Sequence, residues 1–388
     1  MKPRLKLKPF LICILGLYGF SWSFSETVLV SAFGYTVELP PDWKILDSQD
    51  PHLISFTDAS NRAIFQIAVL SSDHFKDARE MLQFAKAKFN ARGDIATFIY
   101  DQKEAALADF TFLAGRYPAR GYFIGLPHAP HPYLLTGFTS VSYYEEFHDT
   151  LLSLLDSFSP SAEARKAPGI ISQFYNPFPD PKSLTKSISK DNVSLPFQIG
   201  SGEGEANSVV IEREARVLSR YVTQPKLFVE AWKRYYQVVY RDTYLRLASL
   251  ANVIDAHYKE SKIPRHQYPH ELLRWVQSFT YSRPANVSDL ASPVEVALSA
   301  TGDCDARALL FIVLLNHWGF DAILMVSHTY KHAMAAIDIP GQGARMEFEG
   351  KKYLVAEVTD KVNMGLINRD MANPAEWIPI SFNGSIRP

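Results

Sequence analysis

A cysteine in the C-terminal part of the chain, Cys304, lies where its thiol could act as a nucleophile. The apolar sequence ARALLFIVLLNH at residues 306–317 predicts a buried helix, so this thiol stands at a helix N-terminus. Free backbone N–H groups and the positive end of the helix dipole at that position favour a thiolate and lower the pKa of a cysteine. The flanking Asp303 and Asp305 predict partial exposure, and because their charges oppose a thiolate, a cationic partner is needed.

Three short apolar segments that follow this helix are typical of strands. They are DAILMVS at residues 321–327, HAMAAIDI at 332–339 and KYLVAEVTD at 352–360. The mixed-charge sequence GQGARMEFEGKK between the last two predicts a hairpin insertion. In an antiparallel arrangement packed against the cysteine helix, the first residue of the second strand and an acidic residue of the third can fall side by side.

His332 and Glu357 meet that description. The imidazole would take the thiol proton, and the carboxylate would fix the ring tautomer through the other ring nitrogen, so that Cys304, His332 and Glu357 form a catalytic triad. Asp360 is the alternative third member. His328 lies four residues before His332, a spacing that binds zinc on helices, but this segment is predicted as loop and strand without a third ligand, so we expect no metal and no cofactor.

The sequence GDCDARALL at residues 302–310 resembles the G-D-C-x-D/E-x-A/S-x-L motif of the bacterial branch of the transglutaminase-like superfamily. In that branch a strand beginning with His and a strand bearing an acidic residue follow. Upstream, WVQSFTY at 275–281 is similar to the family's helix ending in F-V-Q-x-x-x-Y, and PVEVAL at 293–298 is similar to its P-x-E-T-L element. The resemblance covers about residues 252–382.

This resemblance implies a papain-like, cysteine-protease-like fold and attack on an amide or peptide carbonyl through a Cys304 thioester, which a hydrolase releases to water and an acyltransferase to an amine. Hydrolysis is favoured, because no second-substrate site is recognisable. Gln277 becomes a candidate oxyanion-hole donor, with a solvated helix residue as the alternative. The family usually has Asp where this chain has Glu357. If neither Glu357 nor Asp360 reaches His332, the domain would be a non-catalytic scaffold or binding module of the cell envelope.

The first part of the chain, residues 26–160, alternates apolar segments with turn residues and contains two segments of helical periodicity, 77–91 and 143–158. This pattern predicts an α+β domain. FGYTVELPPDW at residues 33–43, followed by a strand series, a helix and a closing helix, resembles the PsbP-like fold, an α/β sandwich, over about residues 27–161. That fold implies binding or assembly.

Residues 161–207 are rich in Pro, Ser, Lys and Gly and include GSGEGE, a composition typical of a flexible linker. The sequence VVIEREARVL, beginning at Val209, predicts an edge strand. Aromatic residues recur near helical spacing over residues 226–257, which predicts long core helices. Residues 208–388 are therefore expected to form the transglutaminase-like domain with a helical lead-in.

The N-terminus reads as a signal peptide over residues 1–25. The basic sequence MKPRLKLKP precedes an apolar run at 10–22 that is too short to cross a bilayer, and Ser23 and Ser25 predict cleavage after Ser25. The mature chain is expected to be secreted to a bacterial periplasm or cell surface without a membrane span. Export would leave Cys304 as a lone thiol in an oxidising compartment, which calls for a function, although a buried apolar cysteine is the alternative.

The length and the net charge of the chain limit the number of domains and the classes of binding partner. A chain of 388 residues predicts two domains, and 47% hydrophobic with 21% charged residues predicts ordinary globular folding. The net charge of −1, from 40 basic and 41 acidic residues, provides no field that would recruit nucleic acid or an anionic membrane. The expected partner is therefore a protein, peptide or cell-wall peptide substrate.

Overall fold

The computed structural model describes residues 27–30, 33–71, 75–283 and 290–382. It is 38% helical and 31% strand, which confirms the predicted α+β class. The predicted signal peptide lies outside the described residues. Within the described part of the chain, no helix combines the length and apolar character that a membrane crossing requires.

The chain divides into two compact units. Among the described residues, the first contains Asp42–Phe98 and Glu104–Leu151, and the second contains Thr27–Pro41, Ile99–Lys103 and the chain from Leu152 onward. This division differs from the predicted single domain of residues 26–160. Strand β2 (Tyr35–Glu38) pairs with β1 (Thr27–Val30), and Thr36 exchanges two backbone hydrogen bonds of 2.9 Å with Ser159, so this segment belongs to the second unit.

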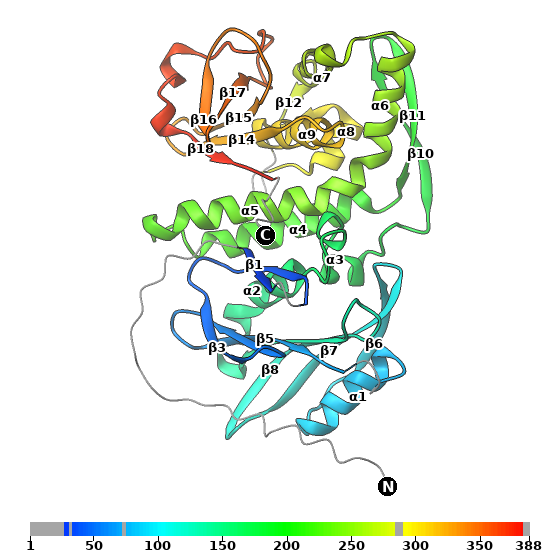
Figure 1. Ribbon diagram of the computed structural model, residues 1–388, viewed down its shortest axis with the longest axis vertical. Helices are drawn as coiled ribbons and strands as arrows, with labels where there is room; N and C mark the ends of the chain where they lie inside the picture. The colour runs from blue at the N-terminus through cyan, green and yellow to red at the C-terminus, as the bar shows by residue number, and fades with distance from the viewer. Residues whose placement is uncertain (1–26, 31–32, 72–74, 284–289, 383–388) are drawn as a thin grey trace. The chain divides into compact units, whose positions relative to one another are not determined.

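A seven-stranded sheet with the order β3-β4-β5-β9-β8-β7-β6 forms the centre of the first unit (Figure 1). Its strands are β3 (Lys44–Asp50), β4 (Leu53–Thr57), β5 (Ala63–Val69), β6 (Ile95–Tyr100), β7 (Lys103–Ala114), β8 (Tyr117–Leu126) and β9 (Tyr133–Ser140). Both predicted helices are confirmed, as α1 (Ala78–Lys88) and α2 (Tyr144–Ser157). Met81 and Leu82 of α1 pack on sheet residues that include Phe110 and Phe123. The first half of β7, KEAALA, consists of good helix formers, so its local sequence does not by itself predict a strand.

The predicted flexible linker, residues 161–207, is folded. It contains α3 (Ile170–Tyr175) and a hairpin of β10 (Ser183–Lys190) and β11 (Val193–Gly200), and α4 (Glu203–Ser219) begins inside GSGEGE. The hairpin exposes its Ser and Thr side chains on one face and buries alternate apolar side chains on the other, namely Ile188, Leu195, Phe197 and Ile199. The polar composition therefore marks an exposed face. The edge strand predicted from Val209 is also wrong, because that segment is part of α4.

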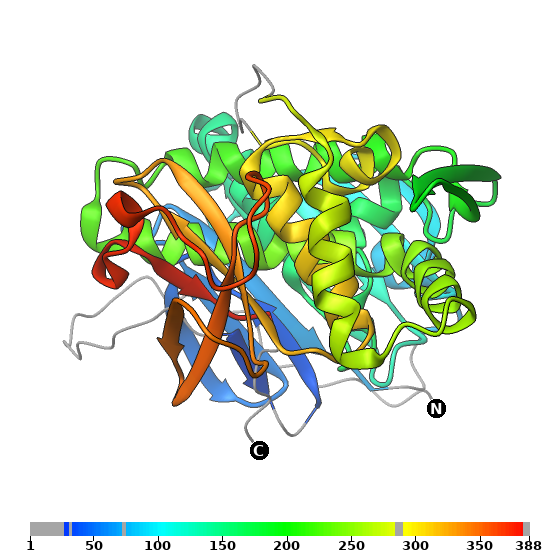
Figure 2. The same cartoon turned by 90° about the horizontal axis from the view of Figure 1, so that it is seen from above.

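Helix α9 (Cys304–His317) is the central element of the second unit. Every residue from 306 to 315 is buried, as expected for a helix that is apolar on all sides. The helix packs against the strands β14 (Ala322–Ser327) and β15 (His332–Ile337) and against α5 (Pro225–Tyr244), α6 (Ala248–Glu260), α7 (Tyr268–Gln277) and α8 (Pro293–Ser299), as Figures 1 and 2 show. The helices predicted over 226–257 and 306–317 are thus confirmed.

The five-stranded sheet beside α9 has the order β16-β17-β15-β14-β18. Its strands are β14 (Ala322–Ser327), β15 (His332–Ile337), β16 (Arg345–Phe348), β17 (Lys351–Ala356) and β18 (Ile378–Ile380). The three predicted strands are confirmed as β14, β15 and β17, and GQGARMEFEGKK forms the β16–β17 hairpin. Pairing of β15 with both β14 and β17 is antiparallel, and Ser327 opposite His332 places His332 at the first position of β15.

Gly302 precedes the cysteine for a packing reason. It belongs to β13 (Thr301–Gly302), which pairs in parallel with β12 (Thr280–Tyr281). A Cβ atom at Gly302 would lie 2.5 Å from a methyl carbon of Val296 on α8. The glycine therefore allows α8 to approach the start of α9 closely.

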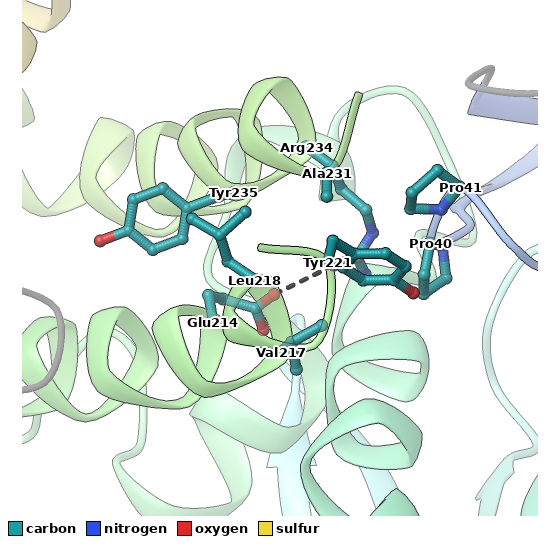
Figure 3. Close-up of a pocket in the computed structure, with 9 residues that line it drawn as sticks. All are labelled: Pro40, Pro41, Glu214, Val217, Leu218, Tyr221, Ala231, Arg234 and Tyr235. Carbon is teal, nitrogen blue, oxygen red and sulfur yellow. Dashed lines mark hydrogen bonds and ion pairs between the residues drawn. The ribbon is translucent and has the colours of Figure 1, made fainter. Parts of the chain in front are cut away.

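A hollow in the second unit lies beside the paired helices α4 and α5 (Figure 3). Its charged lining groups, Glu214 and Arg234, form an ion pair of 3.0 Å and so neutralise each other. It is lined by Pro40, Pro41, Glu214, Val217, Leu218, Tyr221, Ala231, Arg234 and Tyr235. These lining residues include no predicted site residue.

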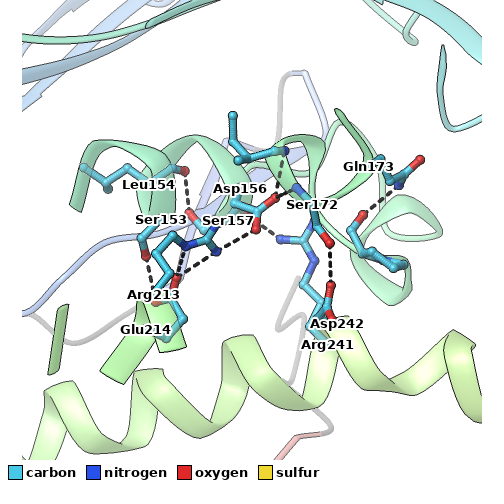
Figure 4. A network of polar contacts seen from close by, with 12 residues as sticks. Ser153, Leu154, Asp156, Ser157, Ser172, Gln173, Arg213, Glu214, Arg241 and Asp242 are labelled. Atoms are coloured by element: carbon cyan, nitrogen blue, oxygen red, sulfur yellow. Dashed lines mark hydrogen bonds and ion pairs between the residues drawn. The ribbon is translucent and has the colours of Figure 1, made fainter. Parts of the chain in front are cut away.

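Buried ion pairs join α4 to α5 and to the end of α2, and a hydrogen bond from Ser172 to Asp242 joins α3 to α5, all within the second unit (Figure 4). Arg213 contacts Asp156 at 2.6 Å and Glu214 at 2.8 Å. Arg246 contacts Asp242 at 3.0 Å and also Glu203. We call this set the buried ion network, and among the described residues it comprises Asp156, Glu203, Arg213, Glu214, Arg234, Arg241, Asp242 and Arg246. Each of its carboxylates contacts a guanidinium, which offsets the desolvation of both charges.

Candidate active site

Cys304 begins α9, as predicted, but its expected partial exposure is wrong. The residue is only 4% exposed. Asp303 is also buried, and its carboxylate accepts hydrogen bonds from the backbone N–H groups of Ala306 at 2.8 Å and Ala291 at 2.9 Å. An acidic neighbour that caps the helix in this way does not draw the thiol towards solvent.

The hydrogen-bond partner of the thiol is Asp305. Cys304 Sγ donates to Asp305 Oδ1 at 3.0 Å, and the hydroxyl of Tyr236, from α5, donates to Asp305 Oδ2. Burial, followed by the charge and hydrogen bond of Asp305, raises the pKa of Cys304 well above its ordinary value, although the backbone N–H of Ala333 acts in the opposite direction. The predicted lowering of the pKa is therefore reversed, because loss of water and an adjacent carboxylate outweigh the helix dipole.

His332 and Glu357 are brought together at the start of β15 and just beyond the end of β17. His332 Nε2 lies 2.7 Å from Glu357 Oε2. Glu357 Oε1 accepts from the backbone N–H of Thr359 at 2.8 Å and from its hydroxyl at 2.5 Å. The contacting acid is thus Glu357, and Asp360 acts on His332 only through its charge. The Trp377 ring packs edge-on against the imidazole, with centroids 6.3 Å apart.

Burial and pairing oppose each other in this acid–base pair. Burial lowers the pKa of His332, but the hydrogen bond and charge of Glu357 outweigh it and raise that pKa above 6.5. Burial raises the pKa of Glu357, but His332 and Thr359 outweigh it and lower that pKa below 4.5. Pairing thus favours the charged imidazolium–carboxylate form of these two residues over the uncharged form, against the effect of burial.

Cys304 and His332 approach the same place from α9 and β15. The N–H of Ala333, the residue after His332, contacts the thiol sulfur. Among the described residues, however, the sulfur's side-chain hydrogen bond goes to Asp305, and no hydrogen bond joins it to the imidazole. The predicted triad is therefore present as two adjacent pairs, Cys304 with Asp305 and His332 with Glu357.

Gln277, the candidate oxyanion-hole donor, is hydrogen-bonded to the protein backbone. Its amide nitrogen donates to the backbone carbonyls of Glu357 at 2.8 Å and Val362 at 2.9 Å, and the residue is only 5% exposed. Both amide protons are thereby used, so Gln277 is neither a free oxyanion donor nor a solvated helix residue. Its role in the fold is to hold the segment that presents Glu357.

Arg307 is a residue of the site that the sequence reasoning missed. It is 1% exposed and donates to the backbone carbonyls of Gly302 at 3.0 Å and Phe279 at 2.9 Å. Burial lowers its pKa, and nearby groups that include Cys304 and Glu357 act in the opposite direction. The signal was an arginine inside the apolar run ARALLFIVLLNH, one helical turn after Cys304. It supplies a fixed positive charge beside the thiol.

The described residues offer no candidate metal site. Within the part of the chain that the structure describes, no three His, Cys, Asp or Glu side chains gather as a metal site. His328 is exposed and packs edge-on against Phe228, with ring centroids 6.2 Å apart.

No protein-family model and no curated protein matches this chain. Solved structures do resemble it. Cyanobacterial PsbP (CyanoP) from Synechocystis sp. PCC 6803 has a TM-score of 0.30 at 13% identity and covers 38% of this chain and 98% of its own. The Ran-binding protein Mog1p of Saccharomyces cerevisiae has a TM-score of 0.28 at 9% identity and covers 37% and 99%. Both match the N-terminal part.

A protein of Bacteroides thetaiotaomicron matches over more of the chain. It covers 85% of this chain and 89% of its own, with a TM-score of 0.27 and 8% identity. At these scores none of the three similarities carries an argument about activity.

Proposed function

We propose that the protein is a thiol-dependent enzyme that attacks an amide or peptide carbonyl through Cys304. The observation that carries the proposal is the 2.7 Å contact between His332 and Glu357. The N–H of the next residue, Ala333, contacts the sulfur of a cysteine at a helix N-terminus. An imidazole oriented by an acid next to a thiol is the arrangement that nucleophilic catalysis by cysteine requires. The transglutaminase-like motif at residues 302–310 supports the same class, and with it a papain-like fold for the second unit.

Each group has a role in the proposed reaction. In the neutral imidazole the Nε2 proton is held by Glu357, which leaves the Nδ1 lone pair to take the proton from Cys304 Sγ. The thiolate adds to the carbonyl carbon, the C–N bond breaks, and the imidazolium gives its proton to the departing amine. Water then attacks the thioester and releases a carboxylic acid, or an amine attacks it and forms a new amide. Arg307 partly offsets the acidic groups around the sulfur.

The substrate class that we propose is a protein, peptide or cell-wall peptide, met after export to the cell envelope. The support is the signal-peptide pattern of residues 1–25. For the first unit we propose a PsbP-like fold that serves binding or assembly, on the basis of the sequence at residues 33–43 and the strand series after it.

The test uses the mature chain with mixed peptides, including cell-wall peptides, in the presence and absence of hydroxylamine. Mass spectrometry would detect new carboxyl termini from hydrolysis and hydroxamates from trapping of the thioester. Cys304→Ser and His332→Ala are each expected to abolish both products. The matched control is His328→Ala, which removes an exposed histidine four residues away and should leave the products unchanged. Products that persist in Cys304→Ser would refute the proposal.

A second candidate is a non-catalytic scaffold or binding module. The observation that favours it is the hydrogen bond from the Cys304 thiol to Asp305, which together with burial keeps the thiol protonated near neutral pH. Under this candidate the wild-type chain forms no Cys304-dependent product. A strain that carries Cys304→Ala in place of the wild-type chain would then show the same cell-envelope integrity as the wild type.

A further inference from the structure

Asp305 is held from two sides. Its Oδ1 accepts the thiol hydrogen bond of Cys304 at 3.0 Å, and its Oδ2 accepts the hydroxyl hydrogen bond of Tyr236. Both donors are buried, with 4% of Cys304 and 1% of Tyr236 exposed. The carboxylate also lies in the first turn of α9, where the helix N-terminus favours negative charge. Asp305 therefore has a defined orientation towards the sulfur.

This contact directs the thiol proton away from the expected base. A cysteine is nucleophilic as the thiolate, and a carboxylate at this position stabilises the thiol instead, because it accepts the S–H and repels a negative sulfur. His332 is at the same time engaged with Glu357 through Nε2. Cys304 must therefore release Asp305 before His332 can receive its proton.

We infer that Asp305 is a positioning residue that holds Cys304 as a protonated, resting thiol, and that Tyr236 fixes Asp305 in the orientation which this requires. The inference rests on the proposed function of Cys304 as the nucleophile. Activation is a rotation of the Cys304 side chain from Asp305 towards His332, followed by proton transfer from Sγ to Nδ1 of the neutral imidazole. The resting state also protects a lone cysteine in an oxidising compartment, because oxidation and mixed-disulfide formation proceed through the thiolate.

Other groups near the sulfur have contacts of their own. Asp303 caps α9, Arg307 donates to two backbone carbonyls, and Glu357 is paired with His332. The titratable and charged groups around the thiol and the His332–Glu357 pair are, from α9, Asp303, Asp305 and Arg307; from α5, Tyr236; from β12, Tyr281; from β15, His332; and from the segment after β17, Glu357 and Asp360. Asp305 is the member that hydrogen-bonds the sulfur through its side chain.

The experiment measures the pKa of Cys304 in the full chain by thiolate absorbance against pH, with the Cys304→Ser chain subtracted. Iodoacetamide alkylation of the Cys304 peptide at pH 7, followed by mass spectrometry, gives the reactivity. Asp305→Asn should lower the pKa of Cys304 by at least about one unit and raise alkylation by about tenfold or more. Tyr236→Phe should raise alkylation by about twofold to threefold, and should add nothing in the Asp305→Asn background.

Two control variants test for indirect effects. Tyr240→Phe removes a half-buried phenol from α5, and Asp338→Asn removes a carboxylate that pairs with Lys351 at 3.4 Å. Neither should change alkylation by more than about twofold. If Asp305→Asn does not fold, Asp305→Glu takes its place, because it retains the charge but displaces the carboxylate. The alkylation rate of the Tyr236→Phe chain then tests the inference, which predicts a rise.

An unchanged or raised pKa of Cys304 in the folded Asp305→Asn chain would overturn the inference. Failure of the proposed function gives a different result, in which the Asp305→Asn shift is present but no Cys304-dependent product forms. If products form and the shift is absent, the function stands and the resting state is wrong.

Discussion

Two buried charge clusters in the second unit use similar residue types but match their charges differently. In the buried ion network, which the described residues define, four arginines accompany four carboxylates and every carboxylate contacts a guanidinium. Around Cys304 the acidic groups Asp303, Asp305 and Glu357 accompany the fixed cation Arg307 and the titratable His332. Matched charges hold helices together, whereas an acid-rich cluster with a histidine and a thiol can change its protonation.

The two clusters are connected through α5. This helix contributes Arg234, Arg241 and Asp242 to the buried ion network and Tyr236 to the thiol site. Fixing the helix by ion pairs also fixes the hydroxyl that orients Asp305. A rigid support of this kind is what a positioned functional group needs.

The largest effect is expected in the buried ion network. Arg246→Ala would leave Asp242 and Glu203 buried without their guanidinium, which should lower the free energy of unfolding by about 3 to 5 kcal/mol in urea denaturation. The control is Arg274→Ala, whose side chain is 61% exposed and which should cost less than about 1 kcal/mol. Equal losses in the two variants would contradict the distinction between matched buried charge and surface charge.

A smaller and pH-dependent loss is expected for Glu357→Gln, about 2 kcal/mol at its maximum. The raised pKa of His332 means that its contribution is complete below 6.5 and is lost as pH rises through the folded-state pKa. The lowered pKa of Glu357 means that its contribution is complete above 4.5 and is lost as pH falls. The stability difference between wild type and variant should therefore peak between about pH 4.5 and 6.5. A difference that stays constant from pH 3.5 to 8.5 would show that the two residues do not form an ion pair.

Gln277→Ala should lower the free energy of unfolding by about 1 to 2 kcal/mol, because two backbone carbonyls lose their donor. Chemical denaturation of the variant beside Gln198→Ala, which alters an exposed hairpin glutamine, would measure the difference. A Gln277→Ala chain of wild-type stability with a large loss of turnover would instead restore the oxyanion role.

The smallest change in stability is expected for Cys304→Ser, within about 1 kcal/mol, because a serine hydroxyl can donate to Asp305 in place of the thiol. The same variant should lose all alkylation at position 304. Thermal unfolding and peptide mass spectrometry on one preparation would measure both effects. A loss of several kcal/mol would indicate that Cys304 is mainly a packing residue.

The sequence by itself determined the local elements of the site. An unbroken apolar run of helical length defined α9, and β-branched, aromatic and alanine-rich segments bounded by turn residues defined β14, β15 and β17. These patterns reflect periodicities within one element, so they need no knowledge of a partner. They were sufficient to place Cys304 and His332 at the starts of their elements and to favour Glu357 beside the imidazole.

Only the tertiary structure decided where the polar groups point and which segments fold together. The hairpin of β10 and β11 reads as a linker because it is apolar on one face only, and that face is meaningful only against its packing partner. Gln277 turns to carbonyls 80 and 85 residues away. Cys304 lies against Asp305 because burial and Tyr236, from another helix, determine that orientation. The contacts of Gln277 and Tyr236 join residues far apart in the chain, and sequence periodicity carries no information about them.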